Sequence, residues 1–194
     1  MTSAAAADDL PRDGAPEIAL VGRSNVGKSS LINALVRQRV ARTSAAPGKT
    51  RLANVYRIER ASAVLHLIDL PGYGYAQRHR TDDDAPEFGD LAQAVFERKP
   101  GALLLVDSRH PGLDSDRAAW AWLSGAAAHA AIVATKIDKL ARGERIRAMR
   151  ELQSVFDAPV VPVSAGTGEG MEELWKLIAS LSKPRPPRRT NPNA

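Results

Sequence analysis

The sequence has no cysteine, is only 5% aromatic and contains no run of about 18 consecutive apolar residues. The lack of cysteine excludes a disulfide scaffold, a Cys-ligated zinc site, an iron–sulfur cluster and a thiol nucleophile. The lack of a long apolar run predicts that no segment spans a membrane. The first residues contain neither a basic leader nor a strong apolar block, so they do not predict a signal peptide. We therefore expect a cytoplasmic protein.

The rest of the composition is that of an ordinary globular protein. The chain has 194 residues, of which 44% are hydrophobic and 25% charged. This length suits one domain with a core that needs no metal or disulfide. We expect that domain over residues 16–182, between a flexible acidic arm at 1–15 and an extended basic tail at 183–194. The tail prolines lack the amide donor that a helix or a central strand requires.

The net charge of +5 is unevenly distributed along the chain. Residues 18–68 contain nine basic residues and one acidic residue, whereas residues 69–97 contain two basic and seven acidic ones. A basic block of this kind can meet a polyanion, and an ordinary solvated surface is the alternative. The same two readings apply to residues 138–150, which carry bases at 139, 142, 145, 147 and 150.

Short apolar stretches alternate with segments of helical periodicity. Most of the stretches are apolar on both faces, as expected when helices cover both sides of a sheet. We predict an α/β three-layer sandwich with a six-stranded, mostly parallel sheet and one antiparallel edge strand, formed by a hairpin over 52–69. The expected strands are 18–21, 52–59, 64–69, 102–107, 131–136 and 160–163, and the expected helices are 28–36, 88–98, 114–127, 144–156 and 171–181.

A phosphate-binding pattern follows the first of these strands. Residues 22–29 read G-R-S-N-V-G-K-S, which fits G-x-x-x-x-G-K-[ST] at the start of a helix. The glycines let backbone amides point at phosphate oxygens, Lys28 reaches the β and γ phosphates, and the Ser29 hydroxyl can ligate Mg²⁺. A Gly-rich turn without a ligand is the alternative. The predicted nucleotide contacts are Gly22, Arg23, Ser24, Asn25, Val26, Gly27, Lys28, Ser29 and Ser30.

Two further motifs stand at strand ends. In Asp69-Leu70-Pro71-Gly72, the carboxylate can hold the metal through water, and the Gly72 amide can sense a γ-phosphate. In Thr135-Lys136-Ile137-Asp138, the carboxylate can accept hydrogen bonds from both N1–H and the 2-amino group of guanine, which adenine cannot offer. The stem of Lys136 can lie over the base. We expect a backbone amide of the segment Val163, Ser164 and Ala165 to meet the guanine carbonyl oxygen.

These motifs lie within longer sequence segments that resemble a known family. The segments are G-R-S-N-V-G-K-S-S-L-I-N-A-L, A-R-T-S-A-A-P-G-K-T, D-L-P-G-Y-G-Y-A, V-D-S-R-H-P-G-L-D and T-K-I-D-K-L. On these segments the chain resembles the EngB (YihA/YsxC) family of bacterial ribosome-assembly GTPases, which are Ras-like and belong to the translation-factor-related class. The resemblance implies a Ras-like domain and Mg²⁺-dependent hydrolysis of GTP to GDP. The oligomeric state stays open, although a single small domain of this kind is most often a monomer.

The resemblance also implies roles for single residues. Thr50 would be the threonine that ligates Mg²⁺ and closes on the γ-phosphate, with Gly48 and Lys49 beside it, so the implied catalytic residues are Lys28, Thr50 and Gly72. Asn25 marks related GTPases that use K⁺ beside the phosphates, and a tight loop conformation is the equal alternative. Arg109 and Asp114 are either structural ion-pair residues or contacts to a partner.

Tyr73 occupies the position at which many GTPases carry a glutamine that orients the attacking water. A phenol cannot do this in the same geometry, so we expect slow intrinsic hydrolysis. The function implied is a GTP/GDP switch for assembly of the large (50S) ribosomal subunit that contacts its rRNA, with a linked requirement for septation. The alternative is a GTP-dependent adaptor that recruits a protein through residues 73–90 without touching RNA. A third hypothesis, a nucleotide kinase, is disfavoured because the sequence has no evident lid segment and because T-K-I-D indicates guanine binding.

Overall fold

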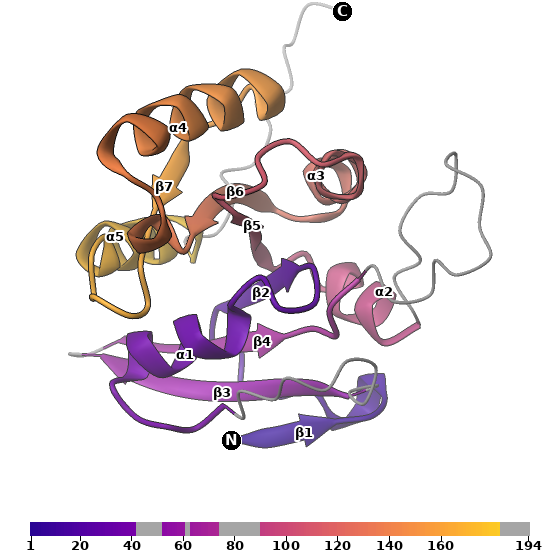
Figure 1. Ribbon diagram of the computed structural model, residues 1–194. Helices are drawn as coiled ribbons and strands as arrows, with labels where there is room; N and C mark the ends of the chain where they lie inside the picture. Colours follow the sequence, from indigo (N-terminus) through magenta and orange to yellow (C-terminus); the bar gives the residue numbers. More distant parts are fainter. Residues whose placement is uncertain (42–51, 61–62, 74–89, 183–194) are drawn as a thin grey trace, which may run out of the picture.

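One sheet of seven strands forms the centre of the molecule (Figure 1). The computed structural model describes residues 1–41, 52–60, 63–73 and 90–182. The strand order is β1-β3-β4-β2-β5-β6-β7, with β1, β3 and β4 paired antiparallel and the remaining pairs parallel. The strands are β1 (Thr2–Ala4), β2 (Glu17–Gly22), β3 (Ala53–Arg60), β4 (Ala63–Asp69), β5 (Gly101–Asp107), β6 (His129–Thr135) and β7 (Val160–Pro162).

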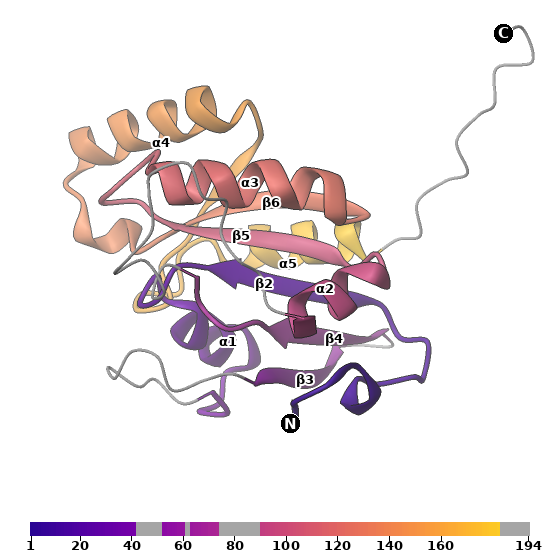
Figure 2. The ribbon, with the colours of Figure 1, turned by 90° about the vertical axis from the view of Figure 1, so that its right-hand side faces the viewer.

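Helices cover both faces of this sheet (Figure 2). They are α1 (Lys28–Val36), α2 (Asp90–Glu97), α3 (Asp114–Ala126), α4 (Arg142–Phe156) and α5 (Met171–Leu181), with short 3-10 turns η1 (Ala7–Asp9) and η3 (Ile137–Lys139). Helices α1 and α5 bury their apolar faces on one side, and α2, α3 and α4 do so on the other. None of the helices in the described ranges has the length and apolar character needed to cross a membrane.

The central strands explain this layering. Every residue of β5 is buried, and alternate side chains enter opposite cores. Leu103 and Leu105 pack with α1 and α5, whereas Leu104 and Val106 pack with α2, α3 and α4. The expectation of a mostly parallel sheet with helices on both faces is therefore confirmed.

The expected elements are found with small shifts at their ends. The hairpin is present as β3 and β4, paired antiparallel from Asn54↔Asp69 to Arg60↔Ala63. The helix expected at 144–156 begins earlier, at Arg142, because the Glu144 carboxylate accepts a hydrogen bond of 2.9 Å from the Ala141 amide and caps the first turn. The helix expected at 88–98 is described from Asp90 to Glu97.

The N-terminal segment differs from the expectation. The sheet has seven strands rather than six, because Thr2–Ala4 pairs antiparallel with β3, and the segment is not a free arm. Ala4 is fully buried and Leu10 is 3% exposed, both in the core on the α2 side. The Asp9 carboxylate accepts hydrogen bonds from the amides of Ala5 and Ala6 at 2.8 and 3.1 Å, which shapes the turn between these two contacts.

The parallel strands bring four chain segments to one edge of the sheet. Register pairs near that edge are Leu20↔Asp69, Gly22↔Leu105 and Asp107↔Thr135. The segments that follow β2, β4, β5 and β6 therefore leave the sheet side by side. Ligands of open α/β sheets bind outside this carboxyl edge.

Candidate functional site

The phosphate-binding loop connects β2 to α1 by a tight path. A Cβ atom on Gly22 would lie 2.8 Å from Val26 Cγ1 and 3.0 Å from the Leu105 carbonyl oxygen, so no larger residue fits there. Gly27 has φ of 111°, and Asn25 has φ of 62°, in the left-handed region that asparagine tolerates better than most residues. This backbone turns the chain back before the helix begins at Lys28.

The charges of Lys28 and Asp69 interact at this loop. Burial lowers the pKa of Lys28, and the negative charge of Asp69 opposes that shift. Burial likewise raises the pKa of Asp69 to about 6, and the charge of Lys28 opposes the rise. Among the described residues, the buried Oδ1 of Asp69 has no hydrogen-bond partner. A buried carboxylate oxygen with a spare lone pair fits the needs of Mg²⁺.

No group of three or more His, Asp or Glu side chains in the described ranges could hold a metal on its own. Mg²⁺ at nucleotide sites is usually bound by one or two protein ligands together with phosphates and waters. Asp69 and the Ser29 hydroxyl at the start of α1 suit that kind of site. The residues present therefore fit a phosphate-bound Mg²⁺ better than an all-protein metal cage.

The segment after β4 packs directly on the phosphate loop. A Cβ on Gly72 would lie 3.0 Å from the Ser24 amide nitrogen, and this amide donates a hydrogen bond of 3.3 Å to the Tyr73 carbonyl. The Tyr73 phenol donates a buried hydrogen bond of 2.7 Å to Asp116 Oδ1 on α3. The position that carries the water-orienting glutamine in many GTPases is thus anchored to α3.

The segment after β6 is fixed to the same loop. The Thr135 hydroxyl donates to the carbonyl oxygens of Val26 and Val106, at 2.7 and 3.1 Å. Lys136 has φ of 59°, and its ammonium group donates a hydrogen bond of 2.6 Å to the Asn25 carbonyl. The side chain of Lys136 therefore runs along the phosphate loop, where its stem can lie against a base.

Asp138 meets the loop that follows β7. Its Oδ1 accepts a hydrogen bond of 2.7 Å from the hydroxyl of Ser164, a fully buried residue, and its Oδ2 lies 3.0 Å from Lys139 Nζ. The hydrogen bond from Ser164 and then that from Lys139 lower the pKa of Asp138, so it is a carboxylate at neutral pH. The Val163 amide donates to Ala134 at 2.8 Å, which joins this loop to β6.

The predicted site residues thus gather at one edge. The structure brings together Gly22–Ser30, Asp69–Gly72, Thr135–Asp138 and Val163–Ala165, although they lie far apart in the sequence. Gly48, Lys49 and Thr50 lie outside the described residues, as does most of the segment 73–90. Arg109, which the sequence offered as an ion-pair residue, pairs with Asp107 at 2.7 Å. Within the described ranges it makes no such pair with Asp114.

Sequence reasoning missed two acidic residues of this region, Asp107 and Asp116. Asp107 ends an apolar strand as Asp69 does, which was a usable signal. Asp116 lies in the first turn of α3 and is 1% exposed, with a pKa raised by burial. Its partner Tyr73 is 43 positions away in the sequence, and no local pattern joins them.

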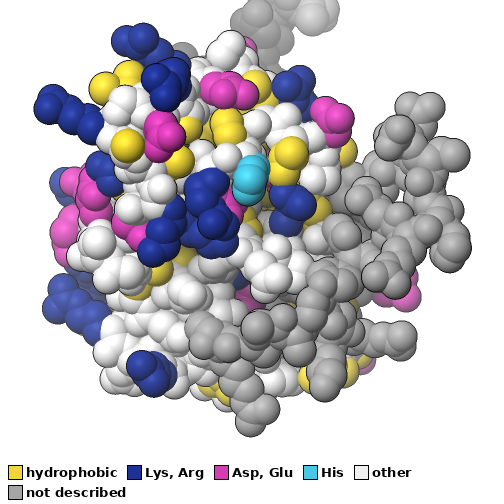
Figure 3. All heavy atoms as spheres, viewed as in Figure 1, with side chains coloured by type: hydrophobic (Ala, Val, Ile, Leu, Met, Phe, Trp, Pro, Cys, Tyr) yellow, Lys and Arg dark blue, Asp and Glu magenta, His cyan; other side chains and the backbone are white. Residues whose placement is uncertain are grey.

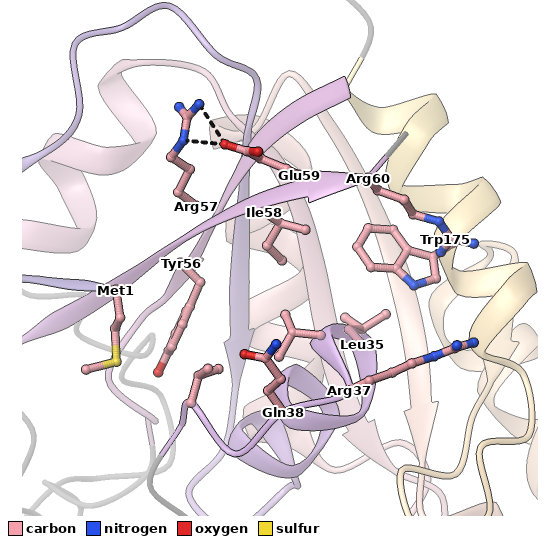
Figure 4. A pocket seen from close by; sticks show the side chains of 12 residues that line it. Met1, Leu35, Arg37, Gln38, Tyr56, Arg57, Ile58, Glu59, Arg60 and Trp175 are labelled. Atoms are coloured by element: carbon pink, nitrogen blue, oxygen red, sulfur yellow. Dashed lines mark hydrogen bonds and ion pairs between the residues drawn. The ribbon is translucent and has the colours of Figure 1, made fainter. Parts of the chain in front are cut away.

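A hollow of about 460 Å³ lies elsewhere, between α1, β3 and α5 (Figure 4). Its walls include the apolar side chains of Leu35 and Ile58, and the Arg60 guanidinium stacks on Trp175 at 4.6 Å. Arg60 also pairs with Glu172 at 3.1 Å, and Arg57 pairs with Glu59 at 3.0 Å. None of the nucleotide-site residues described above lines this hollow.

Helix α4, which follows the T-K-I-D segment, has a basic outer surface. Arg145 is tied to Glu169 by two hydrogen bonds of 2.7 and 2.8 Å. Arg142, Arg147 and Arg150 are exposed and form no ion pair with any described residue, and Ile146 between them is 48% exposed. Figure 3 shows Lys and Arg side chains projecting where Figure 1 places α4.

Comparisons with known proteins agree with this geometry. A family model described as "50S ribosome-binding GTPase" matches residues 17–136. A relative named "Probable GTP-binding protein EngB" from Heliobacterium modesticaldum is 40% identical over 184 residues, covering 91% of this chain and 87% of the relative. One of the same name from Pelotomaculum thermopropionicum is 41% identical over 184 residues, covering 92% and 91%.

Solved structures share the fold. A crystal structure of a probable GTP-binding protein engB is 22% identical, with a TM-score of 0.59, and the match covers 85% of this chain and 97% of that one. The structure of Era with MgGDPNP and 16S ribosomal RNA nucleotides is 23% identical, with a TM-score of 0.70, and the match covers 89% and 58%. With the relatives above, these likenesses show that the chain belongs to the EngB family of GTP-binding proteins and is a GTPase.

Proposed function

We propose that this GTPase is a switch required for assembly of the large (50S) ribosomal subunit, with a linked requirement for septation. One observation carries the proposal. The phosphate loop, Asp69 and the Asp138 carboxylate converge on one sheet edge, beside helix α4, on which Arg142, Arg147 and Arg150 form no ion pair with a described residue. The description "50S ribosome-binding GTPase" of the matching family model supports the choice of partner.

In this proposal the nucleotide lies along the carboxyl edge of the sheet. Lys28 stabilises charge on the β and γ phosphates, and the backbone amides of Gly22–Ser30 surround them. Asp138 accepts two hydrogen bonds from guanine, and Lys136 covers the base. Gly72 and Thr50 sense the γ-phosphate, with Gly48 and Lys49 beside them. Leu70, Pro71, Thr135, Val163, Ser164 and Ala165 complete the contacts.

Mg²⁺ would be held by Ser29, Thr50 and Asp69 together with phosphate oxygens. It supplies electrostatic stabilisation of charge that develops on the transferred phosphoryl group. The raised pKa of Asp69 means that burial disfavours its ionised form, which the metal site requires. Lys28 acts against this effect, because its charge favours the ionised carboxylate.

Intrinsic hydrolysis is slow in this proposal, because the phenol of Tyr73 is bonded to Asp116 and does not orient a water. Asn25 either helps to hold K⁺ beside the phosphates or serves the loop conformation alone. Its left-handed backbone at φ of 62° fits the second role. Turnover in KCl and in NaCl at equal ionic strength separates the two, since only the first gives faster turnover in KCl.

The partner is the 50S subunit and its rRNA, contacted in the GTP state. Phosphates of RNA are bound by unpaired Arg and Lys side chains, and α4 offers Arg142, Arg147 and Arg150. We further propose that the protein works in the cytoplasm as a monomer. The nucleotide-binding domain then includes the N-terminal strand and covers residues 1–182, and a basic tail covers residues 183–194.

Co-sedimentation with purified 30S and 50S subunits tests this proposal. The full chain is loaded with GDP or a non-hydrolysable GTP analogue, and pelleting is measured across a salt series. We expect analogue-dependent pelleting with 50S alone, which weakens as salt rises. The variant Arg142→Gln/Arg147→Gln/Arg150→Gln should pellet less and show a salt slope smaller by about 2 to 3. Arg57→Gln, which removes one ion-paired arginine on β3, is a single-charge control.

Three outcomes separate the candidates. Pelleting that does not change with salt favours the adaptor that binds a protein without RNA contact. Equal pelleting of wild type and the α4 variant keeps the ribosomal partner and removes α4 from the interface. No pelleting of the wild-type chain in either nucleotide state overturns the ribosomal proposal and leaves the GTPase activity untouched.

A further inference from the structure

Asp107, the last residue of β5, receives hydrogen bonds from two cationic side chains. Lys136 Nζ donates to its Oδ2 at 2.9 Å, and Arg109 Nη2 donates to the same oxygen at 2.7 Å. Arg109 also donates from its Nε at 2.9 Å and from its backbone amide at 3.1 Å, both to Oδ1. The Asp107 side chain is only 12% exposed. Its orientation is thereby fixed by four donors.

This arrangement favours the ionised form of Asp107. Burial alone would raise its pKa, but the hydrogen bonds from Arg109 and Lys136 prevail and hold the pKa of Asp107 well below its usual range. Charge-assisted hydrogen bonds of this kind are about twice as strong as neutral ones. The Lys136 ammonium group therefore has a fixed, negatively charged partner on one side.

On its other side the same ammonium group bonds to the phosphate loop, at the Asn25 carbonyl. Lys136 thus joins β5 to the phosphate loop, and its own backbone, at φ of 59°, turns directly into the segment that carries Asp138. A non-glycine residue in this conformation persists only where its surroundings hold it. Among the described residues, Asp107 is one of two acceptors of hydrogen bonds from the Lys136 ammonium group.

Arg109 lies on the same side as the guanine-reading carboxylate. The pKa of Arg109 is raised by its hydrogen bonds to Asp107, by the charge of Asp107 and, to a smaller extent, by the charge of Asp138. Its side chain is 42% exposed. The guanidinium group is therefore held by Asp107 and lies within electrostatic reach of Asp138.

We propose that Asp107 is a positioning residue of the nucleotide site and that Arg109 orients its carboxylate. Asp107 fixes the Lys136 side chain between the base and the phosphate loop. Guanine recognition thereby depends on the shape of that loop. The inference rests on the proposed base-reading role of Lys136 and Asp138. Asp107 is thereby added to the residues of the nucleotide site, although it contacts no nucleotide and acts through Lys136. Without Asp107, the Lys136 ammonium keeps one fixed acceptor and loses the orientation that places its stem over the base.

The test is a double-mutant cycle on GDP binding with the full chain. Asp107→Asn keeps the size of the side chain and removes its charge, and Lys136→Met keeps an apolar stem and removes the ammonium. We expect Asp107→Asn to weaken GDP binding about tenfold, chiefly through faster GDP release. In the Lys136→Met background the same change should have less than about a twofold effect, because the coupled partner is already gone.

Two further variants and a stability measurement serve as controls. Arg109→Gln should weaken GDP binding less than Asp107→Asn, because Lys136 and the Arg109 amide still hold the carboxylate. Glu59→Gln removes an acid that pairs with an arginine outside the site and should leave GDP binding unchanged. Thermal unfolding without nucleotide is measured for every variant, so that a loss of fold is not mistaken for a loss of positioning.

The possible failures are distinct. If Asp107→Asn and Lys136→Met weaken GDP binding independently, with multiplicative effects, Asp107 does not act through Lys136 and the inference is wrong. If Asp107→Asn lowers the unfolding temperature while GDP release is unchanged, its role is structural and the inference is also wrong. If Lys136→Met itself leaves GDP binding unchanged, the proposed base-reading role of Lys136 fails, and this inference fails with it.

Discussion

The phenol of Tyr73 donates a hydrogen bond of 2.7 Å to the carboxylate of Asp116, and both side chains are buried. Tyr73 follows the D-L-P-G turn, and Asp116 lies in the first turn of α3. Burial and the charge of Asp116 raise the pKa of the phenol, so it stays protonated and donates throughout the physiological pH range. The bond therefore ties the end of the D-L-P-G turn to helix α3.

Tyr73→Phe should destabilise the protein by about 1–3 kcal/mol, because the buried Asp116 carboxylate loses a donor. GTP turnover should change little, since the phenol is engaged away from the phosphates. Urea unfolding and single-turnover hydrolysis measure the two effects. A large loss of turnover with unchanged stability would contradict the structural role given to Tyr73.

A double-mutant cycle isolates the Tyr73–Asp116 pair. Asp116→Ala removes the acceptor, and in that background Tyr73→Phe should cost less than about 0.5 kcal/mol. The difference from the single variant gives a coupling energy of about 1–3 kcal/mol for residues in direct contact. Additive effects would show that the hydrogen bond contributes nothing to stability.

Lys28→Ala should weaken binding of both GTP and GDP by about tenfold or more, because a charge-assisted hydrogen bond to phosphate is lost. The fold should persist, since removing a partly buried ammonium group also removes its burial cost. Fluorescence titration with a labelled nucleotide measures the affinity. Lys176→Ala on the exposed surface of α5 is the control, and equal effects of the two changes would argue against a phosphate contact.

Asp69 predicts a specific pH dependence of stability in the nucleotide-free protein. Its pKa rises from the ordinary value of 3.8 to about 6 on folding, so between these values the folded state binds more protons. This contribution to stability is therefore present at low pH and is lost as pH rises towards 6. Relative to wild type, Asp69→Asn should gain about 2 kcal/mol of stability between pH 4 and pH 7.

Urea unfolding of both proteins at the two pH values, without Mg²⁺ or nucleotide, checks this difference. The comparison cancels the titration of the groups that do not interact with Asp69, because they are common to the two proteins. A constant stability difference across that range would mean that Asp69 ionises at its ordinary pKa.

The packing of the N-terminal strand gives a further prediction. Ala4 is fully buried in β1, whereas its neighbour Ala5 is exposed. Ala4→Gln should destabilise the protein by about 1–3 kcal/mol, because the larger polar side chain does not fit the core. Ala5→Gln should have little effect. Equal stabilities of the two variants would show that residues 1–15 behave as a free arm.

The sequence was sufficient for the layered fold and the positions of its loops. Strand β5 is apolar on both faces, so helices on both sides follow from its composition alone. The phosphate loop, Asp69 and Asp138 each follow an apolar strand, and parallel pairing places strand ends at one edge. The site could therefore be assembled from motif and topology without coordinates.

The features that the sequence did not reveal depend on contacts between distant residues. Strand β1 is only Thr-Ser-Ala and is followed by alanines and acids, and its pairing with β3 and the burial of Ala4 make it a strand. Asp107 accepts a hydrogen bond from Lys136, which lies 29 positions away in the sequence. Such pairs carry no periodicity or spacing that single-sequence reasoning could use.

The most direct test of the nucleotide site is Asp138→Asn with guanine and xanthine nucleotides. Guanine offers two donors to a carboxylate, whereas xanthine carries a carbonyl oxygen where guanine has its amino group. The asparagine amide can donate to that oxygen. We predict that GDP binding falls by about a hundredfold or more, that XDP binding rises, and that thermal stability is retained. Unchanged GDP binding, or equal loss of both nucleotides in a folded variant, would contradict base recognition by Asp138.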